Sequence, residues 1–375
     1  MSIDQLKIAI VHDWILNLGG AERVLKVLHE MFPDAPIYTL FYNKNFTDSF
    51  LPEADIRPTF LQKTRRWIKK HKLLLPLVPF AVESIDLSDF DLVISSSVAF
   101  SKGLILKTKT THICYCYSPT RFLWDWHSEY ARSEKLKIRN WGVRILQHIL
   151  RIWDGQSANR VDYFVAISKN VQERIRKYYR KNSTVIYPPV ERREGAVKIY
   201  EKSGEAAEFY LIISRLFAHK NIDIAIEAFN KLGYPLVIIG DGPNKKNLKK
   251  ISKKNITFLG ELSDKDTSQY YGKCKAFIMP QEEDFGITPI EAMIYGKPVL
   301  ALRRGGATEY IMENINGEFF DDPTPEVLAD GIRRLNENYK NYSPLVIKKT
   351  AERFSRQRFE NEITSFIKRL PEFKS

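Results

Sequence analysis

Cysteine is scarce in this chain, and long apolar runs are absent from its sequence. Three cysteines (Cys114, Cys116 and Cys274) among 375 residues cannot form a disulfide framework, and one C-x-C spacing is poor evidence for zinc. No uninterrupted apolar stretch approaches the roughly 18 residues that a membrane-spanning helix needs. Residues 1–8 carry an acidic residue and run into a strand pattern, so we expect no signal peptide. These absences predict a cytoplasmic protein.

Two kinds of binding motif are missing as well. The formal net charge of +13 would suit nucleic acid, but the basic segments contain no helix-turn-helix, zinc-finger or RNA-recognition motif, so we expect no nucleic-acid partner. The turn after the first predicted strand carries Gly19 and Gly20 rather than G-x-G-x-x-G, which argues against a dinucleotide-dependent oxidoreductase. A nucleotide-sugar epimerase or a phosphorylase remains compatible with the pattern of elements described next.

The chain does contain short hydrophobic runs that alternate with helical patterns. This alternation predicts an α/β protein in which helices cover parallel sheets. Strands are expected at 6–11, 37–41, 92–95, 113–115, 163–167, 209–214, 236–239, 256–259, 276–279 and 298–301. Helices are expected at 21–31 and 222–232, and a last helical pattern runs from 350 to 370.

A break separates two series of such elements. Residues 187–190 include two prolines, and a charged stretch follows at 191–208, which is typical of a linker. We therefore predict one Rossmann-like domain at 1–190, a second at 191–352, and a C-terminal helix at 353–375.

The segment from Glu283 to Met293 is the most informative one. Gly286 lies where a strand and its loop pass into a helix, and the exposed amides of such a helix start suit an anionic group. Glu283 in the loop and Glu291 on the helix could accept hydrogen bonds from sugar hydroxyls. The alternative is a helix N-terminus whose acidic residues merely complement the helix dipole.

Other strand ends carry similar chemistry. Arg215 follows the first strand of the second series and Lys220 opens the next helix, so two cations lie where parallel sheets bind ligands and where a pyrophosphate would fit. The glycine turn at 240–243 and the pair Gly305 and Gly306 end two further strands.

Together these motifs resemble glycosyltransferase family 4. The resemblance rests on Glu283-x7-Glu291, on the S-R-L…K-N pattern at 214–221, on G-D-G-P at 240–243 and on G-G-A-E at 19–22. It implies a GT-B fold, with two Rossmann-like domains facing a cleft and the C-terminal helix crossing back to the N-terminal domain. It also implies a retaining transfer from a nucleotide sugar.

The resemblance assigns roles residue by residue. Arg215 and Lys220 would hold the donor diphosphate, Glu291 the ribose hydroxyls, and Glu283 the transferred sugar. The donor-binding set that it implies is Gly19, Gly20, Arg215, Lys220, Gly240, Glu283, Phe285, Gly286, Ile287, Thr288 and Glu291.

The stretch at 114–125 is similar to bacterial mannosyltransferases that build O-antigen and related surface polysaccharides, which implies GDP-mannose as the donor. Many relatives have His where this chain has Tyr117. A phenol with a pKa of about 10 is a poor base at neutral pH, so we expect Tyr117 to tune catalysis rather than abolish it. The acceptor-side candidates are His12, Asp13, Arg121 and Asp125. For His12, a histidine satisfied by local hydrogen bonds is an equal alternative.

The sequence also bears on the need for a metal. The two D-x-D spacings, at 89–91 and 264–266, lead into a strand and open a helix, so we interpret both as structural. We expect no metal and no other cofactor, with Arg215 and Lys220 stabilising the departing diphosphate.

Two basic segments, at 63–72 and 139–153, mix Lys and Arg with Trp, Leu and Ile. This mixture suits an anionic membrane surface, and it predicts a peripheral protein at the inner face of the cell membrane whose acceptor is carried on polyprenyl diphosphate. The alternative is an amphipathic helix whose apolar stripe is core. For the whole chain, the alternatives are an inactive nucleotide-sugar-binding subunit or a transferase that uses a UDP-sugar.

Overall fold

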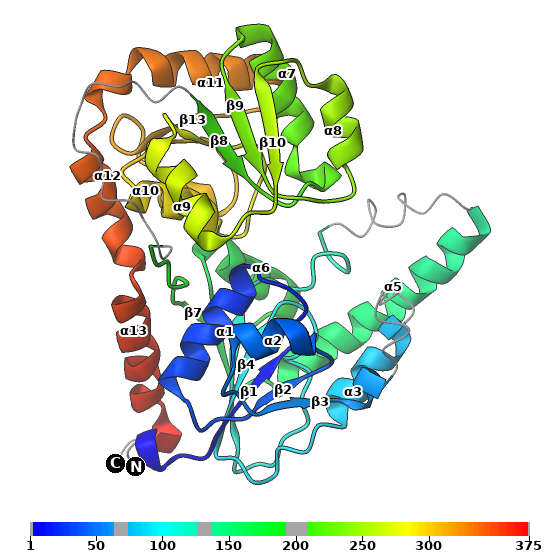
Figure 1. Cartoon of the computed structure of the whole chain (residues 1–375). Helices are drawn as coiled ribbons and strands as arrows, with labels where there is room; N and C mark the ends of the chain where they lie inside the picture. The colour runs from blue at the N-terminus through cyan, green and yellow to red at the C-terminus, as the bar shows by residue number, and fades with distance from the viewer. Residues whose placement is uncertain (1–2, 64–73, 126–136, 193–208, 374–375) are drawn as a thin grey trace. The chain divides into compact units, whose positions relative to one another are not determined.

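A computed structural model describes residues 3–63, 74–125, 137–192 and 209–373. The chain divides into two compact units: unit 1 is Met1–Pro188 with Phe359–Ser375, and unit 2 is Pro189–Arg358. Both are α/β units built on a parallel sheet, and many of their elements are labelled in Figure 1. Within the described ranges, none of the helices has the length and apolar content that a membrane crossing requires.

Unit 1 contains a seven-stranded parallel sheet in the order β3-β2-β1-β4-β5-β6-β7. Its strands are β1 (Ile8–His12), β2 (Ile37–Thr39), β3 (Ile56–Pro58), β4 (Leu92–Ser97), β5 (Thr111–Cys116), β6 (Tyr163–Ala166) and β7 (Ser183–Val185). Strands β1, β4 and β5 are buried along their whole length, as expected for central strands covered on both faces. Strands β2 and β3 extend the sheet on one side of β1, and β4 to β7 extend it on the other side. The strand order therefore reverses between β1 and β4.

The helices of unit 1 are α1 (Gly20–Met31), α2 (Lys44–Phe50), α3 (Val78–Glu83), α5 (Lys137–Ser157), α6 (Lys169–Tyr179) and most of α13 (Arg356–Arg369). The C-terminal segment packs on the sheet, as the family resemblance implied. The ring of Phe359 lies edge-on to Tyr115 with centroids 5.6 Å apart, and the hydroxyl of Tyr163 donates to the carboxylate of Glu372.

Unit 2 contains a six-stranded parallel sheet in the order β10-β9-β8-β11-β12-β13. Its strands are β8 (Tyr210–Ile213), β9 (Leu236–Ile239), β10 (Ile256–Gly260), β11 (Phe277–Met279), β12 (Val299–Leu302) and β13 (Gly317–Phe320). Its helices are α7 (Ile222–Leu232), α8 (Lys245–Ile251), α9 (Asp264–Lys273), α10 (Ile287–Ile294), α11 (Pro325–Glu337) and α12 (Pro344–Ala351). Here the strand order reverses between β8 and β11.

The helical segment predicted at 350–370 is confirmed for Arg356–Arg369, but it is interrupted near its start. Helix α12 ends at Ala351, a 3-10 turn follows at Glu352–Phe354, and α13 begins at Arg356. The break brings the fully buried ring of Phe354 against Phe285, with centroids 5.4 Å apart. The carbonyl of Phe354 also accepts the amide of Val190, so packing in unit 2 overrides the helical pattern.

Candidate functional site

In unit 2 the predicted site residues follow the strands between which the strand order reverses. Ligands of open α/β sheets bind beyond the carboxyl ends of the strands at such a point. Strands β8 and β11 are hydrogen-bonded neighbours there, with Leu211 opposite Phe277. Arg215 follows the first of these strands and Glu283 follows the second. The topology therefore brings together two segments that lie nearly seventy residues apart in the sequence.

Lys220 and Glu283 form an ion pair at this place. Lys220 ends the short 3-10 helix η4 (Ala218–Lys220) and is buried, and its Nζ lies 2.6 Å from Oε1 of Glu283. The side-chain amide of Gln281 donates to the same oxygen at 2.9 Å. The backbone carbonyl of Glu283 accepts the amide of Gly306 at 2.9 Å, so the glycine loop after β12 holds the acidic loop in place.

Glu291 is held from a neighbouring helix. It lies on α10 and is only 2% exposed, and its Oε2 accepts a hydrogen bond of 2.7 Å from the hydroxyl of Tyr271 on α9. The ring of Tyr271 in turn stacks on Tyr295 with centroids 5.4 Å apart. Because the tyrosine fixes its carboxylate, Glu291 has one defined orientation, as a binding residue requires.

Gly286 has a backbone conformation that only glycine adopts without strain. Its φ is +88°, and an added Cβ would lie 2.8 Å from the hydroxyl of Tyr310. Helix α10 follows immediately, and its N-cap position is Gly286, which has no side chain to form a capping hydrogen bond, so the backbone amides of Ile287 and Thr288 lie at a helix N-terminus without this kind of cap. The neighbouring Phe285 is buried and packs on Tyr310, so this predicted donor-binding residue belongs to the core.

The loop that carries Arg215 is fixed by backbone contacts with the loop after β9. An added Cβ at Gly240, whose φ is +131°, would lie 2.0 Å from the carbonyl oxygen of Ser214. The amide of Leu216 donates to the carbonyl of Asp241 at 2.8 Å. Gly240 therefore acts by allowing two backbones to approach each other.

The side chain of Arg215 itself is exposed. Its guanidinium lies 5.7 Å from the ring centroid of Phe217, and that ring stacks on His219 with centroids 5.7 Å apart. This contact is within the range of a cation–π interaction and limits the orientations of the guanidinium. The motif predicted Arg215 as a binding residue, but it did not predict the contact between its guanidinium and the ring of Phe217.

In unit 1, the reversal point between β1 and β4 holds a chain of hydrogen bonds. His12 ends β1 and lies opposite Ser96 in the register of the two strands. Nδ1 of His12 lies 3.1 Å from Oγ of Ser96, which lies 2.9 Å from the hydroxyl of Tyr117. That hydroxyl donates to the carbonyl of Ala21 at 3.1 Å. Burial raises the pKa of Tyr117, so the phenol keeps its proton and cannot serve as a base.

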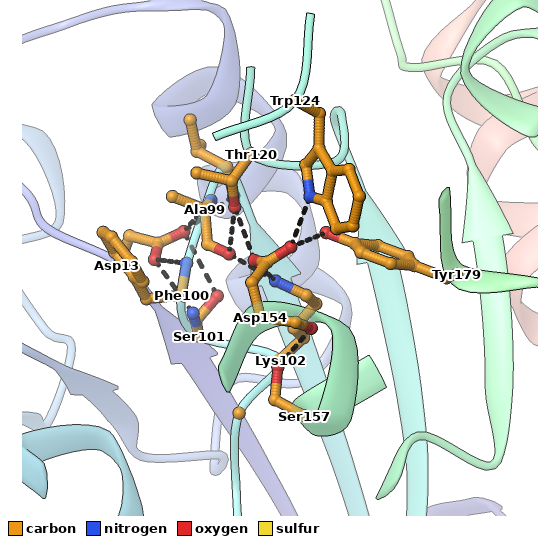
Figure 2. Close-up of polar contacts among 12 residues, drawn as sticks. Asp13, Ala99, Phe100, Ser101, Lys102, Thr120, Trp124, Asp154, Ser157 and Tyr179 are labelled. Carbon is orange, nitrogen blue, oxygen red and sulfur yellow. Dashed lines mark hydrogen bonds and ion pairs between the residues drawn. The ribbon is translucent and has the colours of Figure 1, made fainter. Parts of the chain in front are cut away.

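Asp13, the next residue, has a structural role. It is fully buried, and its carboxylate accepts the backbone amides of residues 98–101 at distances from 2.6 to 3.0 Å (Figure 2). Four amide donors satisfy both of its oxygens and fix the loop after β4.

A second buried carboxylate, Asp154 on α5, was not predicted. Figure 2 shows it at the centre of a polar cluster. Nζ of Lys102 lies 2.5 Å from its Oδ1, and both residues are almost completely buried. Three further side chains donate to it: the hydroxyl of Thr120 and Nε1 of Trp124, both in the loop after β5, and the hydroxyl of Tyr179 on α6. The cluster ties the loops after β4 and β5 to helices α5 and α6.

The remaining candidates in unit 1 have mixed surroundings. Asp125 accepts from the hydroxyl of Tyr178 and pairs with Nε of Arg174 at 3.1 Å, so it joins the 120–125 turn to α6. Arg121 is half-buried in the same turn. Gly19 is the N-cap of α1 and Gly20 is its first residue. All predicted donor residues except these two glycines belong to unit 2, whereas all acceptor-side candidates belong to unit 1.

Two family models match consecutive parts of the chain. The model described as "Glycosyltransferase Family 4" matches residues 18–194, and the one described as "Glycosyl transferases group 1" matches residues 198–357. Three residues between the two matches are not covered, and neither are the two ends of the chain.

Individual relatives are more distant. The alpha-1,3/1,6-mannosyltransferase ALG2 of Candida glabrata is 25% identical over 97% of this chain and 93% of its own length. A glycosyltransferase of Methanocaldococcus jannaschii is 28% identical over 47% of this chain and 50% of its own, so this chain spans about half of that relative. Among solved structures, HepE from Anabaena in complex with UDP and glucose has a TM-score of 0.71, with 19% identity over 98% of this chain and 100% of that one. This likeness concerns the fold.

Proposed function

Because the chain belongs to glycosyltransferase family 4, we propose that it moves a hexosyl group from a nucleotide-sugar donor to a hydroxyl of a glycan acceptor. The observation that carries this proposal is the Lys220–Glu283 ion pair at the reversal point of the sheet in unit 2, in which Lys220 comes from the segment after β8 that also carries Arg215. Cations at this edge suit a diphosphate, and carboxylates suit the hydroxyls of ribose and hexose.

In this proposal each group has one role. Arg215 and Lys220 bind the diphosphate and stabilise the charge that develops as the glycosidic bond opens. When the donor binds, Lys220 gives up its ion pair with Glu283 and pairs with a phosphate instead. The carboxylate of Glu283 can then accept hydrogen bonds from the transferred sugar. Glu291, oriented by Tyr271, binds the ribose. The acceptor hydroxyl attacks from the face that the diphosphate leaves and gives its proton to the departing diphosphate, so the product keeps the configuration of the donor. No metal is needed, because the two cations supply its positive charge.

We propose mannose as the hexose and GDP as its carrier. Relatives with mannosyltransferase names support this choice: ALG2 and the O-antigen chain mannosyltransferase C of Escherichia coli, which is 25% identical over 42% of this chain and 43% of its own length. A UDP-hexose is the second candidate, because HepE, which shares the fold, was solved with UDP and glucose. The two are separated by supplying a panel of nucleotide sugars and measuring which nucleotide is released.

The acceptor is proposed to be a glycan on polyprenyl diphosphate, used in the assembly of a surface polysaccharide at the inner face of the cell membrane. Helix α5 supports a membrane contact. Trp141, Ile145, Ile149 and Ile152 recur at helical spacing, and each is more than half exposed. In Figure 1 the first half of this helix extends away from the sheet of unit 1. The core alternative applies to the opposite face of α5, where Leu150 is buried, and not to these four exposed side chains.

Charge and neighbouring surface fit the same partner. Arg144 and His148 are exposed between the apolar residues of α5. Helix α3 adds the exposed ring of Phe80, and its Glu83 joins the two helices by accepting from Nε1 of Trp153. An amphipathic helix with cations beside Trp and Ile binds an anionic bilayer through both its apolar area and its charge. The basic segment at 64–72 lies outside the described residues.

Sedimentation with vesicles tests this contact. The protein should bind vesicles that contain anionic phosphatidylglycerol at low salt and should bind neutral phosphatidylcholine vesicles at least tenfold more weakly. Joint replacement Ile145→Glu and Ile149→Glu should abolish binding, because it puts two carboxylates into the apolar stripe. The matched control is Leu345→Glu with Val346→Glu, an exposed apolar pair on α12 of unit 2, which should bind as the unchanged protein does. Equal loss in both double variants, or no binding by the unchanged protein, would contradict the proposal.

A further inference from the structure

One nitrogen of His12 is buried and has no hydrogen-bond partner among the residues that the structure describes. His12 is 1% exposed and lies where the strand order of unit 1 reverses. Its Nδ1 contacts Ser96, whereas its Nε2 has no hydrogen bond. A buried polar atom without a hydrogen bond lowers the stability of the folded protein. Native proteins therefore rarely keep such an atom unless it has a structural or functional role.

The hydrogen bonds around Ser96 determine where the protons lie. The carbonyl of Ala21 can only accept, so the hydroxyl of Tyr117 donates to it. Tyr117 then needs the proton of Ser96 across their 2.9 Å contact, because two lone pairs would otherwise face each other. Oγ of Ser96 in turn accepts from Nδ1–H of His12. In the neutral imidazole, Nε2 is therefore the bare acceptor, with its lone pair unused.

A carboxylate stands beside this lone pair. Oε1 of Glu22, on the first turn of α1, lies 4.0 Å from Nε2 of His12, which is too far for a direct hydrogen bond. The side chain of Glu22 is 12% exposed, so it is the outer member of the pair. An added Cβ at Gly19 would lie 2.6 Å from Oε2 of Glu22, so the glycine leaves room for this carboxylate.

We propose that Nε2 of His12 and the carboxylate of Glu22 form a subsite for two neighbouring hydroxyls of a sugar ring. Two acceptors a few ångströms apart match a vicinal diol, whose oxygens each carry one proton to donate. Tyr117 contributes indirectly: its hydroxyl is committed to Ala21 and Ser96, and through Ser96 it keeps the lone pair of His12 directed at the ligand. The inference rests on the proposed function only in that the ligand is a glycosyl group. The sugar is either the hexose of the donor or the terminal residue of the acceptor.

Nitrogen-15 NMR of histidine-labelled protein tests the arrangement without any turnover. His12→Gln identifies the signals of His12 among those of the seven histidines. At neutral pH we expect Nδ1 to be protonated and Nε2 to be unprotonated. Titration with methyl mannopyranoside and, separately, with GDP-mannose should shift the Nε2 signal in at least one case, and the 2-deoxy and 3-deoxy forms of that ligand should bind at least about tenfold more weakly. Other methyl hexosides replace mannose if the donor sugar is a different one.

Kinetics separate the two sources of the sugar. Glu22→Ala is compared with Glu30→Ala, which removes a partly exposed carboxylate from the same helix. If the subsite holds the hexose of the donor, Glu22→Ala raises KM for hydrolysis of the donor without acceptor by at least about tenfold. If it holds the acceptor, hydrolysis is unchanged and KM for the acceptor rises instead.

Three results would overturn the subsite. They are a protonated Nε2, an Nε2 signal that no sugar shifts, and Glu22→Ala kinetics equal to those of Glu30→Ala in both arms. The last two would mean that the pair holds a fixed water only. If instead no nucleotide sugar is hydrolysed or bound while a methyl hexoside shifts the Nε2 signal, the proposed transfer fails and the subsite stands.

Discussion

Replacing Lys220 by Met should lower kcat for sugar transfer by about 10²–10³-fold, the range found when one preorganised electrostatic donor is removed from an active site. The buried ammonium lies 2.6 Å from Glu283 and sits where the diphosphate is proposed to bind. Methionine keeps the length of the side chain but removes its charge. The departing diphosphate then loses a stabilising cation, and Glu283 is left to repel it. Steady-state kinetics with saturating donor measure the change.

The control for this variant is Lys231→Met. Lys231 is an exposed lysine on α7 of the same unit, and it also pairs with a glutamate, Glu326. The same charge is removed away from the reversal point, so kcat should stay within about twofold of the unchanged protein, as expected for a surface pair. Thermal unfolding of both variants verifies that they are folded. A kcat for Lys220→Met within about threefold of the unchanged protein would remove Lys220 from the catalytic set.

Replacing Asp154 by Asn should lower the free energy of unfolding by about 3–5 kcal/mol, because it leaves Lys102 as a buried charge without its partner. The carboxylate is completely buried and accepts hydrogen bonds from three further side chains (Figure 2). Burial and the negative charge of Asp154 raise the pKa of Tyr179, so this phenol keeps its proton and remains a donor. Denaturant unfolding measures the loss.

Glu326→Gln is the matched control for Asp154→Asn, since it removes one carboxylate from an exposed lysine–glutamate pair. It should leave the denaturant midpoint unchanged within error. If Asp154→Asn costs less than about 1 kcal/mol, the cluster is no stronger than an ordinary neutral hydrogen bond, and its role in fixing the loops after β4 and β5 is wrong.

Sequence patterns predicted the central strands and some of the helices, among them α1 and α7, but gave no signal for α2, α3, α6 and α11. Helix α7 and strand β9 have the predicted bounds, because strong periodicity and flanking turn residues define both. The edge strands β3 and β7 were not predicted: each has three residues and no continuous apolar run. Both D-x-D spacings have the structural positions predicted for them, one directly before β4 and one at the start of α9.

The sequence singled out residues of the candidate site but did not indicate their contacts. Lys220 and Glu283 were both singled out, yet nothing in the sequence indicates that they pair, because the topology of unit 2 creates their contact. Asp154 gave no signal, since a single acidic residue in a basic amphipathic helix resembles a solvated one. Only the packing of α5 shows that it is buried.

Nucleotide release from a panel of nucleotide sugars, without acceptor and with excess EDTA, tests the central claim most directly. We expect slow release from one donor, GDP-mannose before the others, because Arg215 and Lys220 take the place of a metal. Release that appears only after Mg²⁺ or Mn²⁺ is added would contradict this mechanism. No release from any donor, together with no binding of any donor in a calorimetric titration, would contradict the proposed transfer itself.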